Sequence, residues 1–196
     1  KRENIQPFLV RHNYTMLEGD ISDSNFLKDV FEKYKIEKVV HLAASVGVRN
    51  SILHPRQYQQ NNVTGTQILL DAAVEHNVSQ FIFASSSSIY GNNSPTPFRE
   101  GAVVDSILST YAQTKKDAEV LCETHHKKYG LPIPVFRFFT VYGPKGRPDM
   151  APYIFTESIL KGKPIPIYGD GSARRDFTYI KDLISGVIAG MENPSP

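Results

Sequence analysis

Apolar positions follow two different patterns along this chain. Short stretches rich in β-branched and aromatic residues predict strands at residues 14–18, 38–42, 80–85 and 133–138. Longer stretches in which apolar residues recur at helical spacing predict helices at residues 25–34, 57–76 and 110–129. Ser24 and Ser109 precede two of these stretches and are expected to be N-caps. Strands that alternate with helices of this length indicate a parallel sheet with right-handed crossovers.

The pattern changes after residue 138. Residues 141–150 contain two glycines and two prolines, so we expect a loop there. Further on, the sequence predicts a helix at 152–161, a strand at 165–168, a Gly-Asp-Gly turn at 169–171, a strand at 176–179 and a helix from 182. A small substrate-binding lobe is expected in this part of the chain.

One element of a typical dinucleotide-binding fold is missing. Such a fold opens with a strand, a glycine-rich turn and a helix whose N-terminus receives the pyrophosphate. No G-x-G-x-x-G or similar run occurs in these 196 residues, and the chain does not begin with methionine. We therefore expect the chain to be an internal fragment of a longer protein that starts after this element.

Composition excludes several classes of partner. The chain has 22 Lys and Arg against 20 Asp and Glu, and a formal charge of +2 is too balanced to indicate binding to nucleic acid or to an anionic membrane. No apolar run reaches the roughly 18 to 20 residues that a membrane span requires. Its single cysteine excludes an internal disulfide and fits a reducing compartment. We expect a cytoplasmic protein without a metal site.

Tyr111 and Lys115 form a Tyr-x-x-x-Lys pair on a predicted helix, and this spacing puts both side chains on one face. A tyrosine that acts as a base at pH 7 costs about 4 kcal/mol unless a nearby cation lowers its pKa. Lys115 would supply that cation. The same spacing at Tyr34 and Lys38 straddles a helix end and a strand, so context matters. Serines 85–88 end a predicted strand, where open α/β sheets bind ligands.

The Ser-Ser-Ser-x-Tyr-Gly run at residues 86–91, followed by Tyr-x-x-x-Lys, resembles the active site of the extended short-chain dehydrogenase/reductases. Within them it is similar to the NAD-dependent epimerase/dehydratase family, and the resemblance spans essentially the whole chain. It implies that Tyr111 is the catalytic base, that Lys115 lowers its pKa and binds the nicotinamide ribose, and that Ser86 bonds the reacting sugar oxygen. Ser87 and Ser88 are near enough to share that role.

Further segments match the family in order and imply an NAD site. Residues 19–21 are similar to its adenine-contacting turn, residues 41–44 to the strand end beside the cofactor, and residues 61–66 to a helix whose first asparagine lies near the nicotinamide. The implied cofactor-binding residues are Asp20, Ile21, Leu42, Ala43, Ala44, Asn61, Ala84, Tyr111 and Lys115.

Two arginine-containing segments, residues 137–144 and 174–177, resemble those that hold the diphosphate of a sugar nucleotide. Guanidinium groups suit this task because they form bidentate bonds with phosphate oxygens. Arg175 matches the family's diphosphate arginine best, and Arg49 could contact a sugar carboxylate. For a UDP-sugar substrate, the implied binding residues are Ser86, Ser87, Ser88, Tyr111, Thr140, Arg147, Arg175 and Arg49.

The residues before Tyr90 and Gly91 bear on the reaction. Family members that eliminate water or carbon dioxide usually carry an acid there, whereas this chain has Ser87 and Ser88. We therefore expect reversible oxidation alone: Tyr111 takes the C4 hydroxyl proton while NAD accepts the hydride and later returns it to the other face. Residues 45–49 and 140–150 look most like the UDP-glucuronate 4-epimerase branch. UDP-glucose or UDP-N-acetylglucosamine 4-epimerisation is the alternative within this class.

These observations predict an α/β fold, an incomplete Rossmann-like doubly wound parallel sheet with part of a small substrate-binding lobe. We expect a partial NAD-binding domain at residues 1–140, a partial lobe at 141–180, and a helix at 181–196 that returns to the first domain. By resemblance, the parent enzyme is a homodimer joined through helices 57–76 and 110–129. Because the glycine turn is missing, the chain alone is expected to bind NAD poorly and its sheet to expose an edge. A noncatalytic structural fragment is the alternative from another class.

Overall fold

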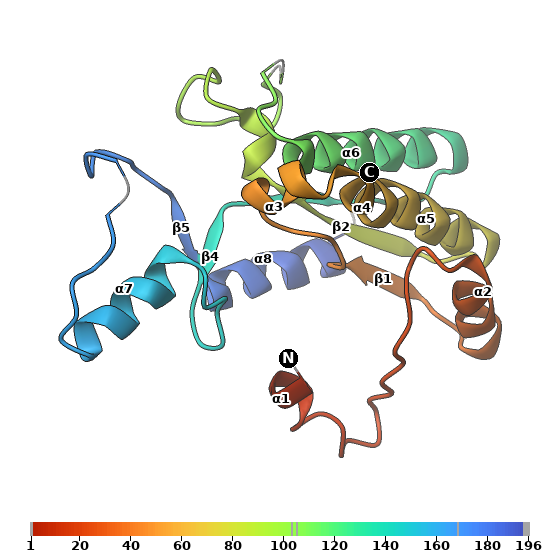
Figure 1. The fold of residues 1–196 in the computed structure, drawn as a ribbon. Helices are drawn as coiled ribbons and strands as arrows, with labels where there is room; N and C mark the ends of the chain where they lie inside the picture. The colour runs from red at the N-terminus through yellow and green to blue at the C-terminus, as the bar shows by residue number, and fades with distance from the viewer. Residues whose placement is uncertain (1, 103, 105, 168, 194–196) are drawn as a thin grey trace. The chain divides into compact units, whose positions relative to one another are not determined.

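The structure, a computed structural model, describes residues 2–102, 104, 106–167 and 169–193. The chain divides into two compact units, which we describe separately (Figure 1). The larger unit comprises Gly19–Phe138 and Val187–Pro196, and the smaller comprises Lys1–Glu18 and Phe139–Gly186. The parallel sheet that the sequence predicts belongs to the larger unit.

A parallel sheet forms the centre of the larger unit. Its strands lie in the order β1 (Lys38–His41), β2 (Gln80–Ser86), β3 (Val135–Phe138). The register pairs His41 with Phe83, and Ser86 with Phe138. The central strand β2 is buried along nearly its whole length, which explains why its sequence reads as a continuous apolar run rather than an alternating one. The predicted strands at 38–42, 80–85 and 133–138 are thereby confirmed, with small shifts at their ends.

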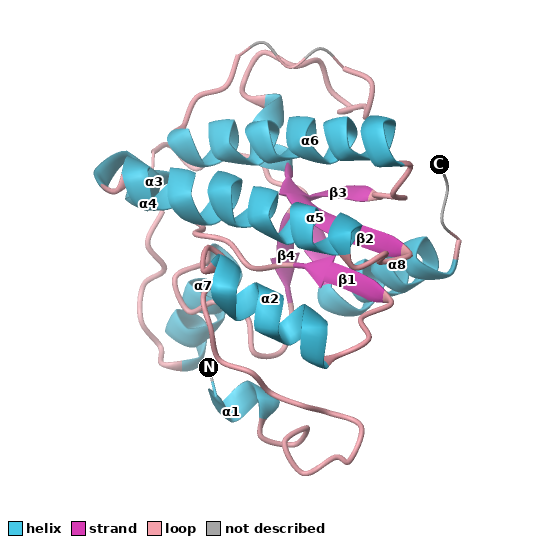
Figure 2. Ribbon diagram, turned by 90° about the vertical axis from the view of Figure 1, so that its right-hand side faces the viewer, coloured by secondary structure: helices cyan, strands magenta, loops and turns pink. Residues whose placement is uncertain are grey.

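Helices cover both faces of this sheet. Figure 2 shows α2 (Ser24–Lys33), α5 (Gly65–Glu75) and α6 (Thr110–Tyr129) on one side. On the other side lies the last part of α8 (Ile180–Glu192), from Val187 onward, which belongs to the larger unit. The end of α8 is held by two polar side chains, because Gln80 Nε2 donates to Gly190 O at 2.7 Å and Lys38 Nζ donates to Met191 O at 2.5 Å. The core contains Leu27, Phe31, Leu69, Leu70, Ala73, Val78, Phe81, Phe83, Ala118, Cys122 and Leu131.

The helix ends follow local capping chemistry. Ser109 Oγ accepts from the Ala112 N–H, so the predicted N-cap of α6 is confirmed, and Gly130 ends this helix in the left-handed conformation. The predicted cap of α2 is wrong by one position. Asp23, not Ser24, caps this helix, because its carboxylate accepts from the N–H groups of Asn25 and Phe26.

The predicted helix at 57–76 is divided into three segments. After a short α3 (Val48–Leu53), the chain forms α4 (Pro55–Tyr58), then a π-helical turn, η1 (Gln59–Thr64), and finally α5. A π-turn widens the helix locally and changes the direction in which its side chains point. Here the buried side chain of Asn62 lies in the widened turn. None of the helices in the described part of the chain is long and apolar enough to cross a membrane.

The smaller unit contains α1 (Arg2–Ile5), the parallel pair β4 (Thr140–Tyr142) and β5 (Phe177–Tyr179), α7 (Ala151–Leu160) and the start of α8. Two predicted strands were wrong. Residues 14–18 and 165–167 form no strand, and Tyr168 lies outside the described residues. A strand requires a neighbouring strand that accepts and donates its backbone hydrogen bonds, and apolar residues alone do not supply one. The predicted loop at 141–150 begins later, because Val141 and Tyr142 belong to β4.

Candidate active site

Lys115 lies under the carboxyl end of the central strand. Its side chain is buried, and Nζ donates a hydrogen bond of 2.7 Å to Ala84 O and lies 4.8 Å from the ring centroid of Phe83. This arrangement arises because α6 packs directly against β2. The bond to Ala84 uses one of the three N–H donors of the ammonium. A buried cation therefore lies at the carboxyl end of the parallel strands, where ligands of α/β folds bind.

Burial changes the acidity of this lysine. Desolvation lowers the pKa of Lys115 to about 8, although the nearby Cys122 and Glu119 favour its charged form. A pKa of about 8 keeps most of the ammonium charged at pH 7. Lys115 is therefore still a cation under neutral conditions, as the lowering of a tyrosine pKa requires.

Tyr111 lies one helical turn before Lys115 and is half-buried. Its ring meets the ring of Tyr58 edge-on, with centroids 6.2 Å apart and an interplanar angle of 84°. Tyr58 is itself completely buried, and its hydroxyl donates to Val46 O at 2.6 Å and to Gly47 O at 3.0 Å. The position of the Tyr111 ring is thus set by a tyrosine that the surrounding backbone holds.

The serine run divides at the end of β2. Ser86 caps the short 3₁₀ helix η2 (Ser87–Tyr90), because its Oγ accepts from Ser88 N at 3.2 Å and from Ser88 Oγ at 2.8 Å. Ser86, Ser87 and Ser88 are half-buried, and η2 packs against α6, the helix of Tyr111. Ser85 donates to Glu119 Oε1 at 2.6 Å, so its side chain faces α6.

The Arg137 side chain is hydrogen-bonded to groups of the protein itself. Its guanidinium donates to both carboxylate oxygens of Glu119, to the hydroxyl of Tyr90 and to the carbonyl of Glu100. The hydrogen bonds to Glu119 raise the pKa of Arg137 above its ordinary value. The expectation that the segment beginning at Arg137 holds a diphosphate therefore does not extend to this side chain, whose donors are directed to groups of the protein.

The predicted cofactor residues lie at several positions around the sheet end. Leu42 and Ala43 are exposed just after β1, while Ala44 is half-buried. Asp20 is exposed and accepts from the N–H and the hydroxyl of Ser22, and the backbone hydrogen bond is the larger cause of its lowered pKa. Ile21 packs against Gly65, where an added Cβ would lie 2.9 Å from the Ile21 side chain.

These residues fit the donor and acceptor groups of a dinucleotide. Asp20 offers a carboxylate acceptor in a tight turn, Lys115 offers a cation for hydroxyl oxygens, and Leu42 with Ala43 leaves apolar surface open at the strand end. Asn61 Nδ2 donates to Ser45 Oγ at 2.8 Å, so its amide contacts the segment that follows Ala44.

Two buried residues of this region belong to segments that the sequence analysis singled out, but neither was assigned a role of its own. His41 Nε2 lies 2.9 Å from Thr66 Oγ1, and burial, helped by the charge of Lys115, lowers the pKa of His41 to about 4. Asn62 is 1% exposed and contacts Ser45 and Thr114. In each case the sequence carried a signal, because a polar residue stands where an apolar one is expected. His41 is the last residue of a strand, and Asn62 lies on the inner face of a helix.

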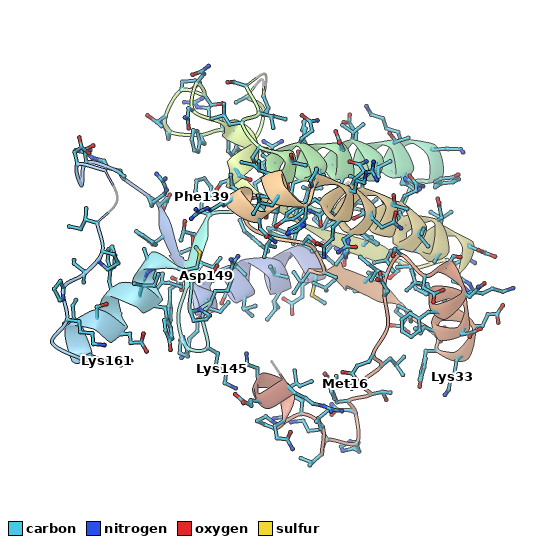
Figure 3. All side chains as sticks on the ribbon, viewed as in Figure 1. Met16, Lys33, Phe139, Lys145, Asp149 and Lys161 are labelled. Atoms are coloured by element: carbon cyan, nitrogen blue, oxygen red, sulfur yellow. The ribbon has the colours of Figure 1, made fainter. Side chains whose placement is uncertain are left out.

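The remaining predicted substrate residues divide between the two units. Arg49 is exposed on α3 of the larger unit. In the smaller unit, Thr140 begins β4, Arg175 is exposed and donates to Arg174 O, and Arg147 forms an ion pair with Asp149, which Figure 3 labels. Arg147 also lines a cavity of about 250 Å³, whose other walls are Val141, Tyr142, Gly143, Gly146, Met150, Pro152, Tyr153 and Thr156. In the described ranges, no group of three or more His, Cys, Asp or Glu side chains is arranged to hold a metal ion.

Known proteins resemble the chain over most of its length. The UDP-glucuronate 4-epimerase of Thermodesulfobacterium geofontis is 49% identical over 180 residues, which are 92% of this chain and 55% of that protein. The crystal structure of UDP-glucuronic acid 4-epimerase from Bacillus cereus, in complex with UDP-glucuronic acid and NAD, is 39% identical with a TM-score of 0.87. The match covers 98% of this chain and 60% of that one.

A relative with a different reaction is also similar in structure. The dTDP-glucose 4,6-dehydratase of Streptomyces venezuelae, crystallised with NAD, is 28% identical with a TM-score of 0.90, over 99% of this chain and 59% of its own. The chain thus spans about half of the curated relatives that it matches. The model of one family, described as the NAD dependent epimerase/dehydratase family, matches residues 1–196. From this match, the Rossmann-like parallel sheet and the Tyr-x-x-x-Lys helix against it, we conclude that the chain belongs to the NAD dependent epimerase/dehydratase family.

Proposed function

We propose that the whole protein is an NAD-dependent nucleotide-sugar 4-epimerase that converts UDP-glucuronate to UDP-galacturonate. The observation that carries this proposal is the buried ammonium of Lys115 at the end of β2, with Tyr111 one turn away on the same helix. The similarity to UDP-glucuronate 4-epimerases supports the choice of sugar.

In this proposal Tyr111 removes the proton from the C4 hydroxyl and later returns one to C4 oxygen. Lys115 is charged at pH 7 and would favour the phenolate form of Tyr111. The phenolate is the form that can accept the proton of the C4 hydroxyl. The Ser86 hydroxyl orients the reacting oxygen, and Ser87 and Ser88 extend this polar strand end. Ser86 is already held in place by its bonds from Ser88.

The cofactor would be bound by Asp20 and Ile21 at the adenosine end and by Lys115 at the nicotinamide ribose. Leu42, Ala43, Ala44, Asn61 and Ala84 would complete the site. NAD, when bound, accepts a hydride from the sugar and gives it back. The role of the chain's own residues is to hold both partners and to move the proton.

Epimerisation is favoured over elimination because the sequence directly before Tyr90 and Gly91 contains no acidic residue. The positions before Tyr90 and Gly91 are Ser87, Ser88 and Ile89, and none of these carries an acid. For the substrate, we propose that Arg49 contacts the sugar carboxylate. Thr140, Arg147 and Arg175 would bind the sugar nucleotide.

The domain organisation and the assembly are part of the proposal. We assign residues 1–140 to a partial NAD-binding domain, residues 141–180 to a partial substrate lobe, and residues 181–196 to a returning helix. The parent protein would dimerise through helices 57–76 and 110–129. Size-exclusion chromatography with light scattering on the full-length protein measures the second point directly.

The test of the reaction is conversion of UDP-glucuronate to UDP-galacturonate by the full-length protein, followed by chromatography of the products. Tyr111→Phe should abolish conversion, because the base is lost while the ring and its contact with Tyr58 are kept. Tyr34→Phe is the matched control, since Tyr34 and Lys38 repeat the spacing away from the sheet's carboxyl end.

The other outcomes are equally informative. Turnover of a neutral UDP-hexose but not of UDP-glucuronate would keep the mechanism and remove Arg49 as a carboxylate ligand. A protein that binds NAD and turns over no sugar nucleotide would refute the proposed function. Full activity of the Tyr111→Phe variant would refute the assignment of the base.

A further inference from the structure

We propose that Arg137 and Tyr90 form a latch that fixes the loop at residues 92–102. Because this loop lies in the chain between Ser86 and Tyr111, the latch would set the spacing between the proposed sugar-binding serine and the proposed base. Arg137 and Tyr90 would be positioning residues, since their contacts are with groups of the protein. The catalytic part of this inference rests on the proposed function, whereas its structural part depends only on contacts within the larger unit.

The two ends of the loop lie beside the proposed catalytic groups. The chain leaves η2 at Gly91, whose φ is +63°, and a Cβ there would lie 2.0 Å from the backbone oxygen of Ser106. Asn93 Nδ2 also donates to Ser106 Oγ at 3.1 Å, so the two ends are held together. Ser109 then caps α6, the helix of Tyr111. Figure 1 shows the loop in yellow-green, on the side of the larger unit where α6 begins.

Tyr90 holds the first half of the loop. Its ring stacks on the ring of Phe98, with centroids 4.5 Å apart and an interplanar angle of 13°. Its backbone oxygen accepts from Ser94 Oγ at 2.6 Å. Tyr90 is itself buried at the end of η2, so two residues of the loop are fixed to a residue that belongs to the core of the unit.

Arg137 holds the second half of the loop. Its Nη1 donates to the Tyr90 hydroxyl at 3.1 Å and to Glu100 O at 3.0 Å, which uses both hydrogens of this nitrogen. Its Nε and Nη2 are bound to Glu119 on α6, so the orientation of the guanidinium is set from the helix. One planar side chain therefore connects β3, α6, the end of η2 and the loop.

This geometry distinguishes a fixed loop from a mobile lid. The contacts that hold it come from a buried tyrosine and from an arginine whose remaining donors are already engaged. A loop held in this way contributes to catalysis by keeping the reacting groups in register, which affects the rate of the chemical step more than the binding of substrate. We therefore expect the latch to act on kcat.

The experiment uses the full-length protein and three readouts: the rate of tryptic cleavage after Arg99, the dissociation constant of NAD, and kcat and KM for UDP-glucuronate. Arg99 is exposed within the loop, and its cleavage reports how often the loop opens. Tyr90→Phe removes the hydroxyl and keeps the stacking with Phe98. Cleavage should become faster, and kcat per NAD-binding site should fall about 10-fold with unchanged KM, as expected for a lost hydrogen bond to a charged group.

Tyr129→Phe is the matched control, because it makes the same chemical change at the exposed last residue of α6. It should alter none of the three readouts. Expressing kcat per NAD-binding site removes the effect of any unfolded fraction, so a purely structural loss would leave this value unchanged.

Phe98→Leu provides a second route to the same answer if Tyr90→Phe does not fold. It removes the ring stacking at a half-buried position and leaves the hydrogen bonds of Arg137 in place. Cleavage after Arg99 should again become faster and kcat lower. The losses of Tyr90→Phe and Phe98→Leu should not add in the double variant, because both act through one loop.

Unchanged cleavage after Arg99 in both variants would overturn the latch, and faster cleavage with unchanged kcat would overturn its link to catalysis. A higher KM at constant kcat, or additive losses in the double variant, would also contradict the inference. If the wild-type protein turns over no sugar nucleotide, the proposed function fails by itself. Cleavage after Arg99 then still decides whether Tyr90 and Arg137 hold the loop.

Discussion

Glu119 and Arg137 form a two-point ion pair inside the larger unit, with Arg137 Nε 3.0 Å from Glu119 Oε1 and Nη2 2.9 Å from Oε2. Glu119 belongs to α6 and Arg137 to β3, and the same carboxylate accepts from Ser85 on β2. The pair therefore joins the helix of the proposed base to two strands of the sheet. Its value lies in fixing these three elements together, since a buried ion pair by itself adds little net stability.

Removal of one partner should destabilise the protein strongly. Arg137→Met leaves the Glu119 carboxylate buried beside Lys116, whose Nζ lies 3.7 Å from Oε2 and compensates only in part. We expect a loss of about 3–5 kcal/mol in the free energy of unfolding. The double variant Glu119→Gln with Arg137→Met should lose less than the two single variants combined. Urea denaturation of all four proteins measures this, and strictly additive losses would contradict it.

Lys115 should make stability rise with pH in the alkaline range. Its pKa is lowered from 10.5 to about 8 by burial, so the unfolded chain binds more protons than the folded one between these values. The cost of burying the charged ammonium lowers the free energy of unfolding in full below pH 8, and this cost disappears as pH rises toward 10.5. Relative to Lys115→Met, the wild-type protein should gain on the order of 3 kcal/mol across this window.

The measurement is the free energy of unfolding at several pH values for both proteins, compared as a difference so that other titrating groups cancel. A difference that does not change with pH would show that Lys115 keeps an ordinary pKa. The same variant should also lose the proposed epimerase activity.

His41 should make stability fall in acid. Thr66 donates its hydroxyl hydrogen to Asn62 O, so His41 donates from Nε2 to Thr66. The lowered pKa of His41 keeps the ring neutral at pH 7 in the folded protein. Burial lowers the pKa of His41 from 6.5 to about 4, and the contribution to stability is lost as pH falls through this range. We expect a loss on the order of 3 kcal/mol that is absent in His41→Phe. Thermal midpoints between pH 7 and pH 4 for both proteins test this, and parallel curves would refute it.

The effect of Gly65→Ala on stability should change sign when Ile21, which contacts Gly65, is shortened. A Cβ at Gly65 would lie 2.9 Å from two carbons of the Ile21 side chain, so Gly65→Ala should cost about 1–3 kcal/mol by overpacking. In an Ile21→Ala background the space is open, and the same change should stabilise α5 by up to about 1 kcal/mol through helix propensity. Chemical denaturation of the four proteins gives both values. Equal effects in the two backgrounds would mean that the contact is not tight.

Much of the larger unit followed from the sequence alone. The strands β1, β2 and β3 and the helix α6 were predicted because continuous apolar runs, helical periodicity and the Ser109 cap are local signals. The Tyr-x-x-x-Lys pair was found in the same way, since its spacing on a helix requires no tertiary information. Residues 14–18 show the limit of this reasoning, because a strand also needs a partner that the local sequence does not specify.

The tertiary structure decided which polar side chains meet. The sequence determined that Tyr111 and Lys115 share a helix face and that serines end a strand. It did not determine that Arg137 would face Glu119, that Ser85 would donate to Glu119 while Ser86 accepts from Ser88, or that Asn62 rather than Asn61 would reach Thr114. Those pairings depend on how α6 packs against β2 and against the π-turn, because each buried donor there must find an acceptor on another element.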